Sequence, residues 1–423
     1  MNKRIKILYV EMAHGMGGSL VSLHQLLRGL DRERYEPIVL FYWDIPYIQR
    51  FRELGVETIV WSGPRQEGDS PVPVPLPTAV NHLRQQGSRL RRLEAQRSLR
   101  KLYHAAGFYA RTLFQTLPLA LRIRRLVRSR GVDIVHANDL VVCNREVIMA
   151  ARMSSRPCIC HIRAFESYTP LDRFLAQFVD RFIFISLCIA QDSIRQGAEP
   201  TKGTVIYNAL DLAEFLQSYD DGAERARLGL APDDRVVGIL GRLVPWKGHR
   251  VFLEAMARVA RQVPNLRCLI VGDAAPGEQA YRAELEALAR DLGLGERCKF
   301  LGWRSDVPAL LSVMDVLVHA SLDPEPFGRV LIEGMAAAKP VVAADGGACP
   351  EIIEHGVSGL LVPPGEAQAL ADAVAGLLGD PDRLHTMGIM ARHQAEARFS
   401  IDEHVRQVER VYEELLGRGG VAP

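Results

Sequence analysis

Short apolar runs alternate with amphipathic stretches along most of the chain. The run Ile5–Val10 predicts a buried strand, and leucines at positions 20, 23, 26, 27 and 30 then share one face of a helix. Further strands are expected at Pro37–Phe41, Thr58–Trp61, Asp133–His136, Cys158–Ile162, Arg181–Ser186 and Thr204–Tyr207. Strands and helices that alternate in this way favour a doubly wound parallel sheet, an α/β fold.

The second half of the chain repeats the pattern. Strands are expected at Arg235–Leu240, Leu266–Val271, Lys299–Leu301, Val316–His319, Val341–Ala343 and Leu360–Val362. A length of 423 residues with 48% hydrophobic residues is enough for two cores. We therefore expect a first domain over residues 1–208, a second over 209–399 and a terminal helix over 400–423. Ser400 and Glu403 have the spacing of a capping box at the start of that helix.

One irregular passage, residues 62–130, interrupts the first domain. Its prolines between Pro71 and Pro77 favour an extended segment. From Arg84 to Arg130 there are thirteen Lys and Arg residues and a single acid, Glu94. Apolar residues alternate with Arg97, Arg100, Lys101 and Arg111, and Arg122, Arg124, Arg125 and Arg128 follow on a predicted helix. One interpretation is a charged helical flap, and the other is a surface that rests on an anionic membrane.

Charge and cysteine usage narrow the function classes. A formal net charge of +2 does not indicate a nucleic-acid-binding protein. The seven cysteines form no CxxC pair, so we expect reduced thiols, no structural zinc and a cytoplasmic location. The apolar run at the N-terminus is shorter than a signal peptide needs, and no stretch reaches the length of a membrane span.

The stretch Ser321–Ala343 carries the clearest chemical pattern. A polar loop leads into a helix expected over Phe327–Ala338, with its first turn after Gly328, and Pro340 ends it. Glu325 and Glu333 bracket the start of this helix. Its N-terminal amides favour an anionic group, while carboxylates accept hydrogen bonds from sugar or ribose hydroxyls. An acidic residue that merely caps a helix is the plain alternative.

Glu325, seven intervening residues and Glu333, with Phe327 and Gly328 between them, resemble the E-x7-E motif of retaining GT-B glycosyltransferases of family 4. The segment Gly241–Gly248 resembles the G-R-L-x-x-x-K-G motif of the same family. Arg242 and Lys247 lie in this loop, where a strand ends and a helix begins. Two solvated cations are the alternative for the loop taken alone.

Three more segments carry the resemblance. Gly17 and Gly18 match a glycine pair that lies against the donor sugar-phosphate in the family. His161 follows an apolar strand, so we expect it at the sheet edge that faces the interdomain cleft, and it matches a family histidine near the transferred sugar better than His136 does. A hydrogen-bonded core histidine remains the alternative. Asn208-Ala209-Leu210-Asp211 resembles the family's N-G-V-D domain junction, with two departures.

The resemblance implies a GT-B fold, with two Rossmann-like domains facing a central cleft and a C-terminal helix that crosses back to the first domain. It implies that Arg242 and Lys247 stabilise the departing diphosphate and that Glu333 binds ribose hydroxyls. Glu325 and the amides of Phe327 and Gly328 would orient the sugar and phosphates, and His161 would support the sugar. The Asp-x-Asp pair Asp380–Asp382 lies at an expected helix start, so no metal is expected.

The expected function is retaining transfer of a sugar from a nucleotide-diphosphate sugar, with UDP or GDP as the carrier, to a hydroxyl of a glycan or lipid-linked acceptor. By this interpretation the enzyme acts in cell-surface polysaccharide or glycolipid synthesis, in the cytoplasm or peripherally on the inner face of the membrane. The alternative is a catalytically silent homologue that binds nucleotide-sugar and assists another transferase, because a fold with binding residues does not establish turnover.

Overall fold

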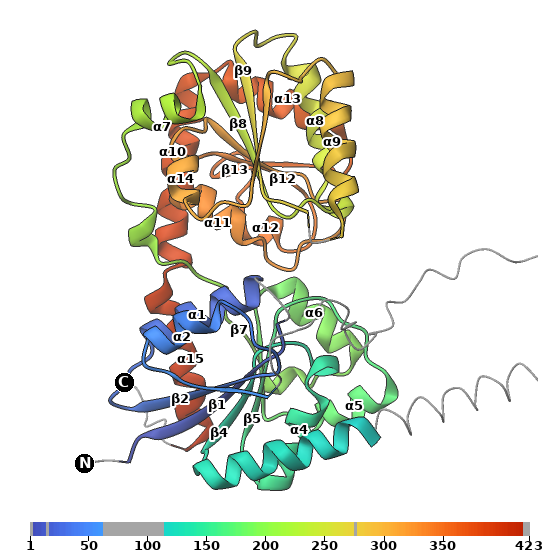
Figure 1. The fold of residues 1–423 in the computed structure, drawn as a ribbon, viewed down its shortest axis with the longest axis vertical. Helices are drawn as coiled ribbons and strands as arrows, with labels where there is room; N and C mark the ends of the chain where they lie inside the picture. The colour runs from blue at the N-terminus through green and yellow to red at the C-terminus, as the bar shows by residue number, and fades with distance from the viewer. Residues whose placement is uncertain (1–2, 14–16, 62–113, 275–276, 418–423) are drawn as a thin grey trace, which may run out of the picture.

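The computed structural model describes residues 3–13, 17–61, 114–274 and 277–417 of the chain. Figure 1 shows two α/β domains, one above the other, with the C-terminal helices running down one side. The first domain contains a seven-stranded sheet and the second a six-stranded sheet. The two-domain doubly wound architecture expected from the sequence is confirmed.

The first sheet has the strand order β3-β2-β1-β4-β5-β6-β7, and every pairing in it is parallel. Its strands are β1 (Ile5–Glu11), β2 (Tyr35–Phe41), β3 (Glu57–Val60), β4 (Ile134–Ala137), β5 (Cys158–Ile162), β6 (Arg181–Phe184) and β7 (Gly203–Val205). Its helices are α1 (Gly18–Gly29), α2 (Ile48–Glu53), a helix over residues 114–130, α4 (Arg145–Ser154), α5 (Pro170–Ala176) and α6 (Leu187–Gln196), with short 3-10 turns at η1 (Val141–Cys143) and η2 (Pro200–Lys202).

The second sheet has the order β10-β9-β8-β11-β12-β13 and is also parallel. Its strands are β8 (Arg235–Leu240), β9 (Leu266–Val271), β10 (Cys298–Gly302), β11 (Val316–His319), β12 (Val341–Ala344) and β13 (Gly359–Val362). Its helices are α7 (Asp221–Leu228), α8 (His249–Val259), α9 (Gln279–Asp291), α10 (Val307–Ser312), α11 (Arg329–Ala336), α12 (Cys349–Ile352), α13 (Ala367–Leu378) and α14 (Pro381–Arg398), with 3-10 turns at η3 (Leu212–Glu214) and η4 (Pro245–Lys247).

Alternation along β1 shows how the first sheet is covered on both faces. Leu8 and Val10 pack in one core cluster with Ile123 of the helix over residues 114–130. Ile7 and Tyr9 point the other way, into a cluster with the leucines of α1. Because both faces are buried, the strands consist of nearly continuous apolar runs.

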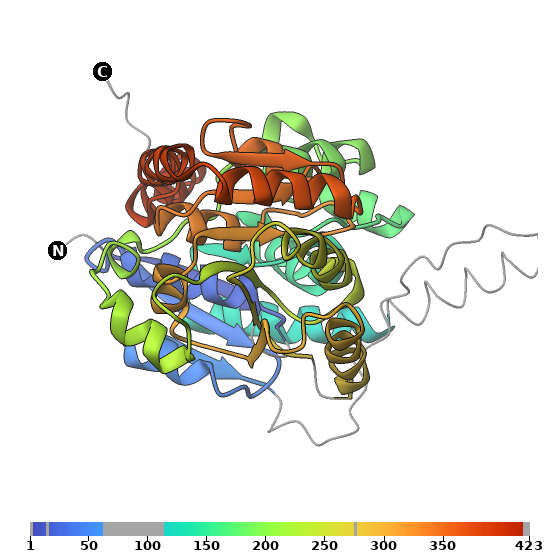
Figure 2. The same ribbon diagram turned by 90° about the horizontal axis from the view of Figure 1, so that it is seen from above.

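The last helix, α15 (Ile401–Leu415), returns to the first domain, as expected for the crossover helix. Figure 2 shows it stacked with α14 at one side of the molecule. The Tyr412 hydroxyl lies 2.9 Å from that of Tyr9 and 2.9 Å from Nδ1 of His136. The linker between the domains is the junction Asn208–Asp211. Within it, the N–H of Leu210 donates to the carbonyl of Phe399 at 3.0 Å. The linker and the C-terminal helices therefore form one joint between the domains.

The capping box expected at Ser400 is absent. The Ser400 side chain makes no capping hydrogen bond, and the Glu403 carboxylate instead accepts from Arg406 and Gln407. Ser400 lies in extended backbone and forms an isolated bridge with Leu210. Pairing with the linker thus replaces the cap at this helix start.

Some sequence-based expectations lie outside the described residues. These are the extended prolines Pro71–Pro77 and the basic residues between Arg84 and Arg111. All seven cysteines are free thiols, in agreement with the reduced state expected. Among the described helices, none is both long enough and apolar enough to cross a membrane.

Candidate active site

The E-x7-E loop is held by two glycines in left-handed backbone. Gly328, at the start of α11, has φ of +83°, and Gly347 has φ of +61°. A Cβ on Gly347 would lie 2.2 Å from the Glu325 carbonyl oxygen, so only glycine fits beside this strand-like bridge. The helix begins after Gly328 as expected, and it ends at Ala336, two residues before the expected end. This geometry fixes Glu325 just ahead of the N-terminus of α11.

Glu325 has three polar partners around one carboxylate oxygen. Its Oε2 lies 2.6 Å from Nζ of Lys247, 3.0 Å from Nε2 of His319 and 3.2 Å from Oγ of Ser321. Burial acts to raise the pKa of Glu325, but hydrogen bonds and charge from His319 and Lys247 outweigh it and lower the pKa to about 2. The carboxylate is therefore ionised at neutral pH and accepts hydrogen bonds.

The loop after β8 carries the two predicted cations, and the structure places them differently. Gly248 must be glycine, because its φ is +73° and a Cβ there would lie 1.8 Å from the carbonyl oxygen of Ala320. This close approach brings Lys247 against Glu325, and its ammonium also lies 4.3 Å from the ring centroid of Trp246. Arg242 is exposed, and its guanidinium makes no hydrogen bond or ion pair with another described residue. Arg242 is thus available to an external anion.

Glu333 lies on α11 with a different cation. Its Oε1 is 3.9 Å from Nε of Arg329, one turn earlier, and its side chain is 17% exposed. Burial raises the pKa of Glu333, and the charge of Arg329 opposes that rise. The two motif carboxylates are therefore each paired with a cation of their own, Glu325 with Lys247 and Glu333 with Arg329.

The N-terminus of α11 also offers backbone donors. Neither Phe327 nor Gly328 donates its N–H to an acceptor among the described residues. The Phe327 side chain is buried between Tyr207 and Phe399, with ring centroids 6.2 and 6.0 Å away. Packing of this ring fixes the backbone of the loop while its amides stay available to a ligand.

The glycine pair begins α1 in the first domain. Gly17 has φ of −151°, which any residue can adopt, and a Cβ built on it would meet no atom within 4 Å. A Cβ on Gly18 would lie 3.6 Å from Cδ of Arg329 in the second domain. The two glycines therefore lie next to α11 of the second domain, and the space over Gly17 is open.

His161 does not face the interdomain cleft, contrary to the expectation from its place near the end of β5. Its side chain is fully buried and lies 5.6 Å from His136 and 6.2 Å from His404 of α15, measured between ring centroids. Burial and the charge of Arg163 hold the pKa of His161 well below its usual value. Its position is that of a core histidine, the alternative that the sequence left open.

Arg163, two residues further along, occupies the edge of the sheet instead. Its guanidinium donates to Oδ1 of Asn138 at 2.6 and 3.1 Å and to Oδ1 of Asn208 at 3.0 Å. Asn138 in turn donates to Oε2 of Glu11 at 2.5 Å. Burial raises the pKa of Glu11 to about 7, with Asp139 adding to the rise. These residues form a buried polar network at the ends of β1, β4 and β5.

Four residues of these sites were missed from the sequence. Asn138, Arg163 and His319 each lie at or just beyond the end of a strand, so the rule that ligands bind at the carboxyl ends of parallel strands would have found them. Arg329 is the first residue of α11, next to the motif glycine. Its hydrogen-bond partners Ser22 and Ala209 lie more than 100 residues away in sequence, and no local pattern indicates them.

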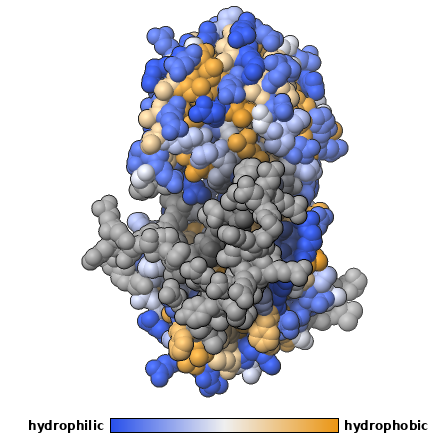
Figure 3. Space-filling model, turned by 90° about the vertical axis from the view of Figure 1, so that its right-hand side faces the viewer, coloured by the Kyte–Doolittle hydropathy of each residue, from blue (hydrophilic) through white to orange (hydrophobic). Residues whose placement is uncertain are grey.

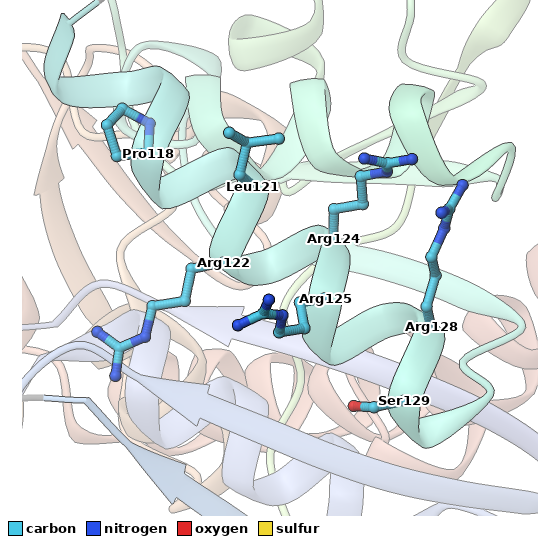
Figure 4. A pocket seen from close by; sticks show the side chains of 7 residues that line it. All are labelled: Pro118, Leu121, Arg122, Arg124, Arg125, Arg128 and Ser129. Atoms are coloured by element: carbon cyan, nitrogen blue, oxygen red, sulfur yellow. The ribbon is translucent and has the colours of Figure 1, made fainter.

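A second region of interest lies on the first domain, on the helix over residues 114–130 at the bottom of Figure 1. It lines a pocket of about 780 Å³ with Pro118, Leu121, Arg122, Arg124, Arg125, Arg128 and Ser129. Figure 4 shows the four arginines fanning out from this one helix. Phe114, Leu117 and Leu121 on the same helix are exposed apolar residues. Hydrophobic and hydrophilic residues also lie side by side on the described surface of the lower domain in Figure 3.

In the part of the chain that the structure describes, no three His, Cys, Asp or Glu side chains are grouped so that they could hold a metal ion. Asp380 caps α14, since its side chain accepts from the N–H of Arg383 at 3.1 Å. Asp380 thus acts as the cap at the helix start expected for this pair.

Comparisons with known proteins agree with this geometry. The family model for glycosyl transferases group 1 matches residues 220–394, and that for the glycosyl transferase 4-like domain matches residues 17–209. A D-inositol 3-phosphate glycosyltransferase of Segniliparus rotundus is 35% identical over 302 residues, which are 70% of this chain and 65% of that protein. The lipopolysaccharide core biosynthesis mannosyltransferase LpsB of Rhizobium meliloti is 30% identical over 215 residues, 50% of this chain and 61% of LpsB. The matches thus span under two thirds of these relatives.

Among solved structures, HepE of Anabaena in complex with UDP and glucose superposes with a TM-score of 0.78 at 27% identity, covering 97% of this chain and all of HepE. A glycosyltransferase of Rickettsia africae reaches a TM-score of 0.79 at 19% identity over 98% of this chain and 99% of its own, which supports the fold alone. With both halves matched by the family models and the E-x7-E loop in place, the chain belongs to the group 1, or family 4, glycosyltransferases of GT-B fold.

Proposed function

We propose that this protein is a retaining glycosyltransferase that moves a sugar from a nucleotide-diphosphate sugar to a hydroxyl of a glycan or lipid-linked acceptor. One observation carries the proposal. The ionised Glu325 lies just ahead of the N-terminus of α11 and pairs with Lys247, which shares one loop of the second domain with the exposed Arg242. Acceptor oxygens, backbone donors and a cation are the groups that a sugar diphosphate needs.

Each group has a proposed role. Arg242 binds the diphosphate, for which its fork of N–H donors is suited. When Lys247 moves away from Glu325, its positive charge also binds the diphosphate. Glu325 then accepts hydrogen bonds from the sugar hydroxyls. Glu333 accepts from the ribose hydroxyls, and the amides of Phe327 and Gly328 bind phosphate oxygens. Gly17 and Gly18 allow the backbone of the first domain to approach the donor.

The transfer step breaks the bond between the anomeric carbon and the diphosphate oxygen. The acceptor oxygen forms the new bond on the same face of the sugar, and its proton passes to the leaving phosphate. Negative charge grows on the diphosphate as the bond breaks, so Arg242 and Lys247 stabilise the transition state more than the ground state.

Release of free nucleotide tests this proposal directly. The full-length protein is incubated with UDP-, GDP- and ADP-sugars and a panel of polyol and glycan acceptors. HepE was crystallised with UDP-glucose, and LpsB is a mannosyltransferase, so a UDP- or GDP-sugar is expected to be used. A bound nucleotide-sugar stabilises the fold by about 2.7 kcal/mol at a hundred times its dissociation constant. Stabilisation by a donor without turnover on any acceptor would favour the silent homologue instead.

Metal dependence is a separate test. Turnover is expected to continue in EDTA, because Arg242, Lys247 and the start of α11 supply the positive charge that a metal ion would otherwise provide. Activity is measured before and after chelation, and then with Mg²⁺ or Mn²⁺ restored. Complete loss on chelation that either ion reverses would contradict the metal-independent mechanism.

We also propose that the helix over residues 114–130 rests on an anionic membrane surface and presents the enzyme to a lipid-linked acceptor. Exposed Phe114, Leu117 and Leu121 offer apolar side chains beside a cluster of arginines. A basic residue near such a surface contributes on the order of 1 kcal/mol. The basic residues between Arg84 and Arg111, outside the described part of the chain, would add to this attraction.

Co-sedimentation with vesicles tests the membrane proposal. Binding is expected with anionic vesicles at low salt, and it should fall at high salt and when Arg125 and Arg128 are changed to Gln. The control changes Arg195 and Arg406 to Gln, which removes the same charge from exposed positions elsewhere. Protein that stays in the supernatant with anionic vesicles at low salt would favour a water-soluble acceptor.

A further inference from the structure

Arg329 is a largely buried cation whose side chain joins the two domains. It begins α11 in the second domain, and its side chain is only 15% exposed. Its Nη1 donates to Oγ of Ser22 at 3.1 Å and to Oε1 of Gln25 at 3.3 Å, both on α1. The same nitrogen lies 3.3 Å from the carbonyl oxygen of Ala209 in the linker. One side chain thus contacts both domains and the linker.

The contacts of Arg329 connect two parts of the candidate donor site. Within its own helix it pairs with Glu333 at 3.9 Å, and Glu333 is the proposed ribose acceptor. Across the junction its Cδ would lie 3.6 Å from a Cβ on Gly18, the first residue of α1. Arg329 therefore lies between Glu333, the proposed ribose acceptor, and the glycine pair of the first domain.

Other contacts across the junction are of different kinds. Ser186 donates to the carbonyl of Pro326 at 2.7 Å, and Glu351 accepts from two backbone N–H groups at the start of α6. The ion pair between Arg28 and Asp211 has a half-exposed arginine, and such pairs contribute little. A largely buried guanidinium costs more to leave without acceptors than an exposed one, so separation of the domains is expected to be unfavourable at Arg329.

We infer that Arg329 is a positioning residue that sets how often the domains adopt the arrangement in which α1 and α11 meet around the donor. This inference rests on the proposed donor site, because it concerns the contact between Gly18 and the helix of Glu333. If the arrangement is populated only in a fraction of molecules, the apparent donor dissociation constant rises by the inverse of that fraction. Arg329 then affects binding through the domains and not through its own contact with the substrate.

The test compares Arg329→Met with Arg392→Met in the full-length protein. Met matches the length of the arginine stem without its charge or donors. Arg392 is a matched control, because it donates to the carbonyl of Ala336 on the same helix and lies within the second domain. Amide hydrogen exchange of α1 and of the linker is measured without ligand, together with the radius of gyration by solution scattering. Arg329→Met is expected to speed exchange in α1 and to expand the molecule, and Arg392→Met is expected to do neither.

Donor binding and turnover then separate positioning from direct contact. Arg329→Met is expected to raise the donor dissociation constant about tenfold, which is about 1.4 kcal/mol, with a smaller change in kcat at saturating donor. Arg329→Lys keeps the charge beside Glu333 and should recover part of the affinity. Changing Ser22 and Gln25 to Ala should weaken binding in the wild type and add nothing to Arg329→Met.

Two results would overturn the inference. The first is unchanged exchange in α1 and an unchanged radius of gyration for Arg329→Met. The second is a loss confined to kcat with normal donor affinity, which would make Arg329 a group that touches the reacting atoms. The exchange and scattering data need no substrate, so they remain decisive even if the protein binds none of the nucleotide-sugars and the proposed function fails.

Discussion

The carboxyl edges of the two sheets use their charged groups in opposite ways. In the first domain, Glu11, Asn138, Arg163 and Asn208 are buried, and hydrogen bonds link them in a continuous series. Asn138 and Arg163 both direct side-chain donors at other residues of the protein. Such a network holds strand ends in place and has little left over for a ligand.

The edge of the second sheet has polar groups that no other described residue satisfies. Arg242 is exposed and its guanidinium has no partner among the described residues, and the amides of Phe327 and Gly328 have no acceptor there. Glu325 and Lys247 pair with each other, and Glu325 also contacts His319 and Ser321. Charge that folding leaves uncompensated is available to a substrate, which is the property that electrostatic catalysis requires.

The comparison teaches that a strand-end polar residue is not by itself a sign of ligand binding. The first edge is a scaffold that positions the glycine loop and the linker, and the second is where an anion is expected to bind. Substitutions at the two edges should therefore fail in different assays, the first in folding and the second in turnover.

The largest effect is expected for Lys247→Ala. Loss of a cation whose interaction grows as the diphosphate leaves should reduce kcat by about 10²- to 10³-fold, with a smaller change in donor affinity. Steady-state kinetics and calorimetric donor binding measure the two quantities. Arg250→Ala is the control, since this exposed arginine lies three residues further on, on α8. Equal and small changes in both measurements would place Lys247 outside the site.

Arg163→Met should chiefly reduce stability. Two buried amide oxygens, those of Asn138 and Asn208, lose their donor, and each such loss costs about 1–3 kcal/mol, so a decrease of about 3 kcal/mol in the free energy of unfolding is expected. Urea unfolding of the first domain measures it. The control is Arg181→Met. It removes an arginine that is 35% exposed and forms a loose ion pair with Glu414, at 3.9 Å. A stable Arg163→Met protein that has lost turnover would mean that this edge also binds substrate.

Glu333→Ala is expected to weaken donor binding by about tenfold, equivalent to about 1.4 kcal/mol. Two ribose hydroxyls would lose their acceptor, and Arg329 would lose the carboxylate 3.9 Å away. Calorimetry with a nucleotide-sugar and with the free nucleoside diphosphate measures the change, which should appear with both ligands because both contain the ribose. A loss seen only with the nucleotide-sugar would place Glu333 at the sugar.

Much of this architecture follows from local pattern. The apolar runs Cys158–Ile162 and Arg235–Leu240 have the same bounds as the strands β5 and β8, and α11 begins after Gly328 as the sequence indicates. These features depend on neighbouring residues alone. The pairing of Lys247 with Glu325 was also within reach, because both follow strand ends of one parallel sheet.

What could not be predicted depends on contacts between distant segments. Successive residues of a strand face opposite sides, so Cys160 and Ile162 pack in one core cluster while His161 points toward α15. The sequence does not say which face the last helix covers, and His161 was therefore assigned to the cleft. The bonds from Arg329 to Ser22 and Gln25 cross more than 300 residues and have no local signature.

The last expected effect concerns the histidines that α15 buries, and it appears as a pH dependence of stability. His404 donates from Nδ1 to the carbonyl of Tyr207 at 2.7 Å, and burial together with Arg163 and Arg329 lowers its pKa to about 4. Between pH 6.5 and pH 4 the unfolded chain binds a proton at this histidine and the folded chain does not. The contribution of this histidine to stability is therefore full above pH 6.5. It decreases as the pH falls below 6.5, by at most about 1.4 kcal/mol per pH unit for one group.

His404→Gln keeps a donor for Tyr207 but cannot take up that proton, so its free energy of unfolding should fall less steeply between pH 6.5 and pH 4 than that of the wild type. Glu11, with a pKa raised to about 7, acts in the opposite direction, because its contribution is lost as pH rises from 4.5 through 7. That contribution is present in both proteins and cancels in the difference. Urea unfolding at a series of pH values measures the two slopes, and parallel slopes would show that His404 is already protonated in the folded protein, with α15 docked by other contacts.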